Sequence, residues 1–386
     1  MRRVAIAERA DWKAMLEADG FDFHTINDAP YWVEDAYYAF TLAQIENHIE
    51  DVTTELEAMC RDLAGRIVGD ERLLRRLAIP ETAWDPIAAS WRRDDPSLYG
   101  RFDFAYDGTG PAKLLEYNAD TPTALFETGY VQWRWLEDAR ADGRLPPEAD
   151  QFNSVHDKLV AALARITGGR RLHLTCMDDT AEDRGTVAYL EECARQAGGE
   201  AVFVRLADIG RSADDAFVDD KDRLIAQLFK LYPWEWMLRD DFAAALPATV
   251  TRFIEPPWKA VISNKGLLPL LWEAYPGHPA LLPAFFENDP RKATLGTSFA
   301  RKPLYSREGA NVTLVRDAQV LDADPGPYGR EGYVRQALAP IVGEAGRYVV
   351  LGSWVVAGEA AGLCLREDDG PITKNTSRFL PHAILG

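Results

Sequence analysis

Two short segments on either side of a glycine-rich turn carry residues that could together hold a metal ion. The first reads Arg101-Phe-Asp103-Phe and the second reads Leu-Glu116-Tyr-Asn118, with Asp-Gly-Thr-Gly-Pro between them. Alternate side chains of a strand share a face, so Arg101 lies with Asp103, and Glu116 lies with Asn118. A turn centred on the Thr-Gly step pairs Asp103 with Glu116. Arg101 then faces Asn118, and the segments form a hairpin with polar groups gathered on one face.

The paired carboxylates of this hairpin need a cation. Two acids directly opposite each other, about 5 Å apart, destabilise a hairpin unless a positive charge lies between them. Carboxylate and amide oxygens are the hard ligands that Mg²⁺ takes, often with bridges to substrate phosphates. Asp103, Glu116 and Asn118 are therefore candidate metal ligands. A solvated hairpin face that binds nothing is the alternative, and these residues alone leave both open.

Lys265 is a candidate for pairing with an anion. It lies beside Asn264 at the entrance to the apolar run Leu-Leu-Pro-Leu-Leu-Trp. A lysine among buried residues is costly unless an anion pairs with it. The alternative is a lysine that packs its stem on apolar surface and extends its charge into solvent.

Lys302 belongs to a pattern that suits a phosphate-binding lid. A strand is expected over 298–305, then a small loop with Ser306 and Gly309, then a returning strand over 310–315. The backbone N–H groups and side chains of such a loop can close over phosphates. The motif GxxxxGK[ST] is absent, which disfavours a Walker-type P-loop.

Arg366 ends an expected strand over 359–366. Arginine suits bidentate recognition of a carboxylate, or of the charge that develops on a transferring phosphoryl group. The alternative is a strand-end arginine that pairs with the acids beside it, Glu367 or Asp368.

Glu235 lies between two tryptophans, Trp234 and Trp236. Aromatic faces around a carboxylate could frame a ligand amine. Core packing of the tryptophans is the alternative.

The composition narrows the class of protein. The chain has 386 residues, 47% of them hydrophobic, and a formal net charge of −18. That charge disfavours a nucleic-acid-binding surface and adhesion to anionic membranes. No apolar run approaches the roughly 20 residues that span a bilayer, and the N-terminus lacks the apolar core of a signal peptide. Its four cysteines are scattered, so we expect reduced thiols in a cytoplasmic protein. The motifs HExxH, GxSxG and GxGxxG are absent, which disfavours zinc, serine-hydrolase and dinucleotide sites.

The order of expected elements indicates a mixed α and β protein. Hydrophobic periodicity predicts helices over 32–68, from Asp70 towards Pro80, and over 124–141. Residues 171–176, 181–196 and 200–205 read as strand, helix and strand, a βαβ-like unit. The strands 348–356 and 359–366 form a hairpin around Ala357-Gly358. We expect three segments that build one compact domain, over residues 1–145, 146–255 and 256–386.

In this order the segments resemble the ATP-grasp ligases and, more specifically, the glutathionylspermidine synthase-like family, over roughly residues 30–380. The resemblance rests on the following motifs: Arg101-Phe-Asp103, Leu115-Glu116-Tyr-Asn118-Ala-Asp120-Thr, Phe229-Lys-Leu-Tyr-Pro-Trp-Glu235-Trp, Ser263-Asn-Lys265, Lys302-Pro303 and Gly362-Leu-Cys-Leu-Arg366. It covers the synthetase portion only, without the Cys/His amidase domain of bifunctional members. The fold it implies is α/β (α+β) and ATP-grasp-like. A helix-rich N-terminal part, a preATP-grasp-type βαβ segment and a C-terminal antiparallel nucleotide-binding region make up that fold.

The resemblance also implies roles for the residues, which it assigns as follows: Asp103, Glu116 and Asn118 to Mg²⁺; Lys265 and Lys302 to the nucleotide phosphates; Ser306, Gly309 and Asn311 to a mobile phosphate loop; Arg366 to the phosphoryl-transfer transition state; Arg101 to the acid substrate's carboxylate; and Glu235 to the substrate side. Residues 120–121, Asp-Thr, depart from the serine-rich stretch expected there.

The activity implied is ligation of an acid to an amine with ATP and Mg²⁺ as cofactors, through an acylphosphate. The acid would be a glutathione-like or other short peptide or small molecule and the amine a polyamine. A nucleotide-binding protein without ligase chemistry is one alternative. A carbohydrate-binding or glycosidase-like protein is another, suggested by the 11 tryptophans and many acids. We expect neither a nucleic-acid nor a membrane partner, and the oligomeric state stays open.

Overall fold

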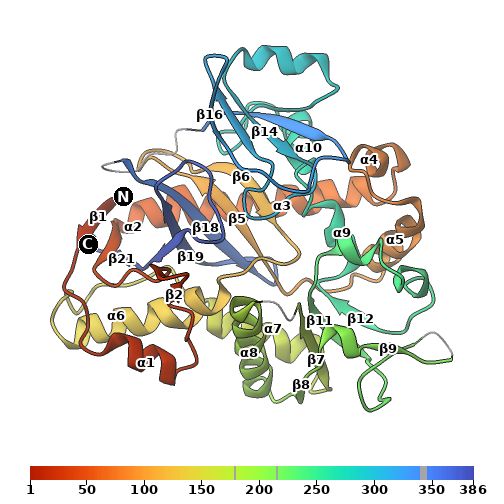
Figure 1. Ribbon diagram of the computed structural model, residues 1–386, viewed down its shortest axis with the longest axis horizontal. Coiled ribbons are helices and arrows are strands. Elements are labelled where there is room, and N and C mark those ends of the chain that lie inside the picture. Colours follow the sequence, from red (N-terminus) through yellow and green to blue (C-terminus); the bar gives the residue numbers. More distant parts are fainter. Residues whose placement is uncertain (178–179, 214–215, 340–345) are drawn as a thin grey trace.

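The computed structural model describes residues 1–177, 180–213, 216–339 and 346–386. Two five-stranded antiparallel sheets dominate its upper half in Figure 1, and a parallel sheet with helices lies below them. Helices and antiparallel sheets are thus combined in one chain, which confirms the mixed α and β class expected from the sequence.

The central sheet joins the two hairpins that the sequence predicts. Its strands are, in spatial order, β20 (Arg378–Leu380), β19 (Glu359–Asp368), β18 (Tyr348–Val356), β5 (Tyr99–Ala105) and β6 (Lys113–Asn118). Pairing of β18 with β5 places Gly352 opposite Asp103. In the turn from β18 to β19, Ala357 and Gly358 have φ of 50° and 85°, the positive values that a two-residue type I′ hairpin requires.

Gly352 lets a charged side chain cross the face of this sheet. A Cβ at that position would lie 2.7 Å from Cδ of Arg101 and 2.5 Å from Sγ of Cys364. Contacts that short do not occur between real atoms of this kind, so the absent side chain leaves the path that Arg101 takes towards Asp103.

The second sheet lies above the central sheet in Figure 1 and carries the predicted lid. Its order is β13 (Ala284–Phe286), β17 (Tyr333–Ala337), β14 (Phe299–Pro303), β15 (Thr313–Arg316) and β16 (Gln319–Ala323). Strands β14 and β15 confirm the strand–loop–strand pattern expected from 298 to 315, in shorter form. Strands β13, β16 and β17 were not predicted.

The βαβ unit of the middle segment is also confirmed. Strand β7 (Leu172–Cys176), helix α8 (Ala181–Gln196) and strand β8 (Ala201–Phe203) run in the expected order, and the two strands are parallel. Two strands that the sequence analysis did not identify, β11 (Gln227–Leu231) and β12 (Arg252–Ile254), extend this sheet on the other side of β7.

The prediction of a helix-rich stretch over 32–68 was wrong at its start. Ala36–Phe40 is strand β4, the middle strand of a three-stranded sheet with β1 (Arg2–Ala5) and β21 (His382–Ile384). All five residues of β4 are buried. A strand buried on both faces shows no alternation of polar and apolar residues, so its sequence is easily mistaken for a buried helix.

The remainder of that segment is helical and supports the central sheet. Helix α2 (Leu42–Ile45) leads through a π-helical turn, η1 (Glu46–Glu50), into α3 (Asp51–Ile67). Helix α3 packs on the sheet, where Thr53 Oγ1 lies 2.7 Å from Ser353 Oγ. The Tyr117 hydroxyl donates to Glu57 at 2.7 Å. These contacts fix the back of the hairpin whose front carries the candidate ligands.

The helix expected over 124–141 begins with a π-helical turn, η3 (Glu127–Val131), and continues as α6 (Gln132–Ala141). The other elements are α1 (Trp12–Ala18), β2 (Thr25–Ile26), β3 (Ala29–Pro30), α4 (Glu71–Arg76), η2 (Glu81–Ala83), α5 (Trp84–Arg92), α7 (Val155–Thr167), η4 (Leu206–Asp208), β9 (Gly210–Arg211), β10 (Phe217–Val218), α9 (Trp234–Met237), η5 (Ala243–Ala245), η6 (Pro257–Val261), α10 (Leu267–Ala274) and η7 (Pro290–Leu295).

Within the described ranges, no helix is long and apolar enough to cross a membrane. The division into segments 1–145, 146–255 and 256–386 stays a prediction. The central sheet takes its strands from the first and the last of these segments.

Candidate active site

One cavity brings together most of the residues singled out from the sequence. It lies between the central sheet and the second sheet, and the loop after β14 forms part of its wall. The predicted site residues that line it are Arg101, Asp103, Glu116, Asn118, Lys265, Lys302, Gly309 and Arg366. The other three, Ser306, Asn311 and Glu235, are not among the described residues of its wall.

The two hairpin acids face each other as the sequence predicts, and cations accompany both. Asp103 pairs in register with Glu116, and Arg101 pairs with Asn118. Arg101 donates to both oxygens of Asp103, at 2.6 and 3.1 Å. Nζ of Lys265 lies 2.7 Å from Oε2 of Glu116. The amide nitrogen of Asn118 lies 3.3 Å from each of the two carboxylates.

These cations determine the charge state of Glu116. Burial raises the pKa of its carboxyl, but the ammonium groups of Lys265 and Lys302 outweigh burial and lower the pKa to about 2. Glu116 is therefore ionised at neutral pH. Lys265 is 9% exposed and is held by this ion pair, so the interpretation of Lys265 as a solvated surface lysine was wrong.

A bulge in β6 makes a place for Lys302. Asp103 pairs with Glu116 and the next pair joins Phe104 to Leu114, so Leu115 has no partner across the hairpin. Nζ of Lys302 donates to the free carbonyl of Leu115 at 2.8 Å and to Oε1 of Gln336 at the same distance. Burial lowers the pKa of Lys302 to about 8, although Glu116 opposes the shift. Lys302 thus joins the second sheet to the hairpin.

Arg366 points at the hairpin and not at its neighbours in the sequence. Its Nη2 lies 3.9 Å from Oδ2 of Asp103. Glu367, the partner considered as an alternative, instead pairs with Arg3 at 2.9 Å. A second arginine contacts the same carboxylate, because Arg101 is bidentate to Asp103. Arg101 also donates to the carbonyl of Thr123 at 2.7 Å. Two guanidinium groups therefore converge on one carboxylate at the cavity wall.

The loop after β14 folds over the cavity with its backbone in left-handed conformations. Glu308, Gly309 and Asn311 have φ of 53°, 76° and 59°. The Ser306 carbonyl accepts from Nζ of Lys265 at 2.8 Å. The side-chain oxygen of Asn311 accepts a hydrogen bond from the backbone N–H of Tyr328 at 2.7 Å. This hydrogen bond ties the loop to the segment that contains Tyr328.

Part of the cavity wall is apolar. Ala300, Val312, Leu314 and Ile372 form a small hydrophobic cluster, with Leu338 packed against it. All five line the cavity. Apolar walls beside a few convergent polar groups are the usual make-up of a site for a planar ring.

The cavity is positive in a protein that is strongly negative overall. Among the described residues that line it, six are Lys or Arg and three are Asp or Glu, whereas the whole chain carries −18. Converging cations at the bottom of a partly closed cavity concentrate anions there. A ligand that carries both several negative charges and an apolar ring matches these two features of the wall.

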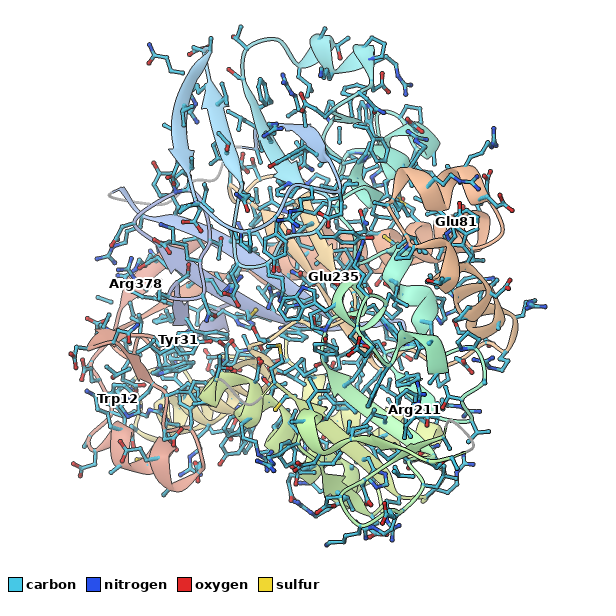
Figure 2. All side chains as sticks on the ribbon, turned by 45° about the vertical axis from the view of Figure 1, so that its right-hand side comes forward. Trp12, Tyr31, Glu81, Arg211, Glu235 and Arg378 are labelled. Atoms are coloured by element: carbon cyan, nitrogen blue, oxygen red, sulfur yellow. The ribbon has the colours of Figure 1, made fainter. Side chains whose placement is uncertain are left out.

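Glu235 lies near this cavity on helix α9, and Figure 2 shows it close to the middle of the molecule. It is half-buried. Its neighbour Trp234 is fully buried and donates to the Glu255 carbonyl at 3.1 Å. The alternative of core packing is therefore correct for Trp234.

The donor set of the hairpin fits a hard cation. Two carboxylates and one amide, from Asp103, Glu116 and Asn118, lie on adjacent strands and face one cavity. No group of three or more His, Cys, Asp or Glu side chains that could hold a metal occurs in the described part of the chain. Any divalent ion here therefore needs the Asn118 oxygen, water or ligand phosphates in addition to the two acids.

Several residues of the wall were not identified from the sequence. Arg307 donates to Oγ1 of Thr121 at 2.6 Å and so ties the loop to the segment after β6. Gln336 fixes Lys302 and also donates to the Leu114 carbonyl at 2.8 Å. The only sequence signal for Arg307 was its place between Ser306 and Gly309. Nothing in the sequence near Gln336 indicated that it would face Lys302.

Comparison with known proteins identifies relatives along the whole chain. A family model described as "Glutathionylspermidine synthase preATP-grasp" matches residues 3–385. A Haemophilus influenzae protein, provisionally named an acid–amine ligase, is 41% identical, with 99% of both chains covered. A trypanothione synthetase of Crithidia fasciculata is 30% identical over 84% of this chain and 53% of its own length.

The bifunctional glutathionylspermidine synthetase/amidase of Escherichia coli is 29% identical over 96% of this chain. The match spans 62% of that enzyme's length. Among solved structures, a glutathione synthetase-like effector from Globodera pallida superposes with a TM-score of 0.57, at 10% identity and with 90% of this chain and 89% of that chain covered. That likeness concerns the fold alone.

Proposed function

Because the chain belongs to the glutathionylspermidine synthase preATP-grasp family, we propose that its cavity joins a carboxylic acid to an amine through an acylphosphate formed from ATP. The relatives are named ligases, and the chain is a carbon–nitrogen ligase of the acid–amine type. The ATP, the Mg²⁺ ion, the two substrates and the residue roles given below are parts of this proposal.

The observation that carries the proposal is the convergence of Lys265, Lys302, Arg101 and Arg366 on the two hairpin acids. Phosphoryl transfer demands positive charge around the transferred group and its leaving oxygen. The apolar part of the cavity wall suits an adenine ring. Asp103, Glu116 and Asn118 would hold Mg²⁺, which when bound neutralises charge on the phosphate oxygens.

In the first step an oxygen of the substrate carboxylate attacks the γ-phosphorus of ATP. The bond from that phosphorus to the β–γ bridging oxygen breaks, and ADP leaves with the electron pair. Lys265 and Lys302 stabilise the negative charge that accumulates on the phosphate oxygens, and Arg366 stabilises the transferring group. Arg101 orients the attacking carboxylate. Its guanidinium lines the cavity, and its hydrogen bond to Asp103 fixes its position there.

In the second step the nitrogen of the amine attacks the acyl carbon. The bond from that carbon to the phosphate oxygen breaks, inorganic phosphate leaves, and the nitrogen gives up a proton as the amide forms. An acylphosphate exposed to water would hydrolyse. The loop over 306–311, which Lys265 and Thr121 hold in place, covers the cavity and protects the intermediate.

The relatives suggest the substrate classes. The E. coli and Crithidia proteins are named for glutathionylspermidine and trypanothione synthesis. We extend this to a short thiol peptide of the glutathione type as the acid and a polyamine as the amine. Glu235 carries a carboxylate near the cavity and is the candidate for contact with the ammonium groups of that amine.

The test is release of ADP in a mixture of protein, ATP and Mg²⁺, with glutathione and a panel of amines added singly and together. We expect ADP release to require both an acid and an amine, and a condensed amide to accumulate in equal amount. Nucleotide binding without turnover on any pair across a broad panel would contradict the ligase activity.

A further inference from the structure

A second cavity lies beside η3. It has a volume of about 630 Å³, which is the size of a site for a small organic molecule. It is bounded by the C-terminal end of α1, by η3 and the start of α6, by the start of α7, and by α8. These helices lie together in the lower part of Figure 1. None of its described lining residues belongs to the proposed active site.

Aromatic rings form one continuous wall of this second cavity. The ring of Tyr130 stacks on Phe126 with centroids 5.6 Å apart and lies 5.8 Å from that of Trp133. Tyr189 continues the wall at 5.4 Å from Phe126. Trp133 is 44% exposed, whereas most tryptophans of this chain pack in the core. An exposed tryptophan beside stacked rings offers its π-face to a ligand.

Carboxylates are the main charged groups of this second cavity. Its described lining includes those of Asp19, Asp157 and Glu192, no Lys or Arg, and one imidazole, that of His156, which lies within hydrogen-bond distance of the Tyr189 hydroxyl and of Gln196 Oε1. Asp19 accepts a hydrogen bond from Tyr130 at 2.9 Å, and Glu192 accepts from Arg195. The Asp157 carboxylate forms no hydrogen bond or ion pair with any side chain that the structure describes. Three carboxylates, one of which (Asp157) has no side-chain partner among the described residues, lie next to aromatic faces, and this combination favours an organic cation.

We propose that this second cavity binds an aliphatic ammonium ion with more than one charge. Aromatic faces attract alkylammonium groups through their negative π-faces, and they also cover the apolar chain between two charges. The separate carboxylates just after α1, on α7 and on α8 can each take one ammonium group. The proposal does not depend on the ligase activity, because the cavity shares no described lining residue with the active site.

The experiment is isothermal titration calorimetry, in which 1,4-diaminobutane is titrated into the full chain without nucleotide. Uncharged 1,4-butanediol is the matched control ligand. We expect binding of the diamine and no binding of the diol. Trp133→Ala should weaken binding about fivefold or more. Asp157→Asn should weaken binding and reduce its dependence on salt concentration.

Two control variants test whether the diamine binds in this second cavity and not elsewhere. Glu148→Gln removes an exposed acid outside the cavity and should leave the affinity unchanged. Glu116→Gln alters the proposed active site and should also leave it unchanged. Equal binding of diamine and diol would overturn the proposal. Full affinity in both Trp133→Ala and Asp157→Asn would overturn it as well, whether or not the protein proves to be an active ligase.

Discussion

Lys265 and Glu116 come from segments about 150 residues apart in the chain and meet with Nζ and Oε2 separated by 2.7 Å. The pair closes the cavity floor between the hairpin and the start of α10. In the free protein the lysine neutralises an acid that, in the proposed complex, would hold a metal ion while the lysine binds phosphate. The ion pair thus holds both side chains in place before any ligand binds.

Replacing Glu116 tests this relationship. Glu116→Gln removes one proposed metal ligand and leaves Lys265 without its partner, so we expect ADP release to fall about a hundredfold or more. The apparent affinity for Mg²⁺ should also fall. Glu71→Gln is the matched control, since it breaks an exposed ion pair with Arg75, and should retain the wild-type rate. Wild-type turnover in Glu116→Gln would refute its assignment.

Arg366 should matter for the rate and much less for nucleotide binding. We expect Arg366→Ala to lower kcat by about a thousandfold, because the guanidinium acts on charge that develops only in the transition state. The dissociation constant for ATP should change little. Arg72→Ala, at an exposed arginine paired with Asp70, serves as control. An Arg366→Ala variant that binds ATP poorly but turns over normally would contradict this role.

The lowered pKa of Lys302 predicts that nucleotide affinity depends on pH. Its pKa is about 8 in the free protein because burial lowers it. The ammonium is therefore present below pH 8 and is lost as the pH rises through 8, so we expect ATP binding to weaken between pH 7 and 9.5. Titrations with ATP over that range measure it. Lys302→Arg keeps its charge and should flatten the profile, and a wild-type profile that is already flat would count against the role of Lys302.

The loop of the active site should depend on the absence of a side chain at Gly309. Its φ is 76°, and a Cβ there would lie 2.5 Å from Cγ2 of Ile372 and 2.7 Å from the carbonyl oxygen of Thr373. Gly309→Ala should raise KM for ATP and lower the melting temperature. Gly296→Ala is the matched control, because Gly296 has φ of 65° but nothing within 4 Å of the added Cβ. Equal effects of both substitutions would mean that the clash is unimportant.

Much of the hairpin and lid could be predicted from the sequence, and the reasons are local. Alternation of residue types around a glycine-rich turn fixes the pairing of Asp103 with Glu116. The bulge at Leu115 could not be predicted, because it depends on a lysine that approaches from another sheet. Strand β4 was assigned to a helix because burial on both faces removes the alternation that distinguishes a strand.

The assembled walls of the cavity were beyond prediction from the residues alone. The apolar part of the cavity wall combines Val312, Leu338 and Ile372. Nothing in the sequence around these residues, beyond their hydrophobic side chains, indicates that they line a cavity. The sequence also left open whether Arg366 serves a ligand or pairs with the acids beside it, Glu367 or Asp368. Packing of the β18–β19 hairpin against β5 decides this, because it turns the arginine towards the other hairpin.

Buried Glu127 should reduce stability at alkaline pH. Burial, with help from Glu182, raises the pKa of Glu127 to about 8, and the Tyr31 hydroxyl donates to it at 2.6 Å. The folded protein keeps this proton between about pH 4.5 and 8 while the unfolded chain loses it. The free energy of unfolding therefore falls as pH rises through that range, by at most about 1.4 kcal/mol per pH unit.

Glu127→Gln removes this titration and keeps an oxygen that accepts from Tyr31. Urea unfolding of the variant should depend less on pH than that of the wild type, with the largest gain near pH 8. Glu148→Gln, an exposed acid, should behave as the wild type does. Identical pH dependence of the Glu127→Gln variant and the wild type would show that Glu127 is not protonated in the fold.

The central claim is that the carboxylate of the acid substrate becomes phosphorylated in the cavity between the two antiparallel sheets. An acid substrate labelled with ¹⁸O in its carboxylate tests this directly, with ATP, Mg²⁺ and an amine present. We expect one ¹⁸O atom in each inorganic phosphate released, read by mass spectrometry, because the acyl carbon–oxygen bond breaks in the second step. Product formation with no ¹⁸O in the phosphate would contradict the acylphosphate and with it the mechanism proposed for this site.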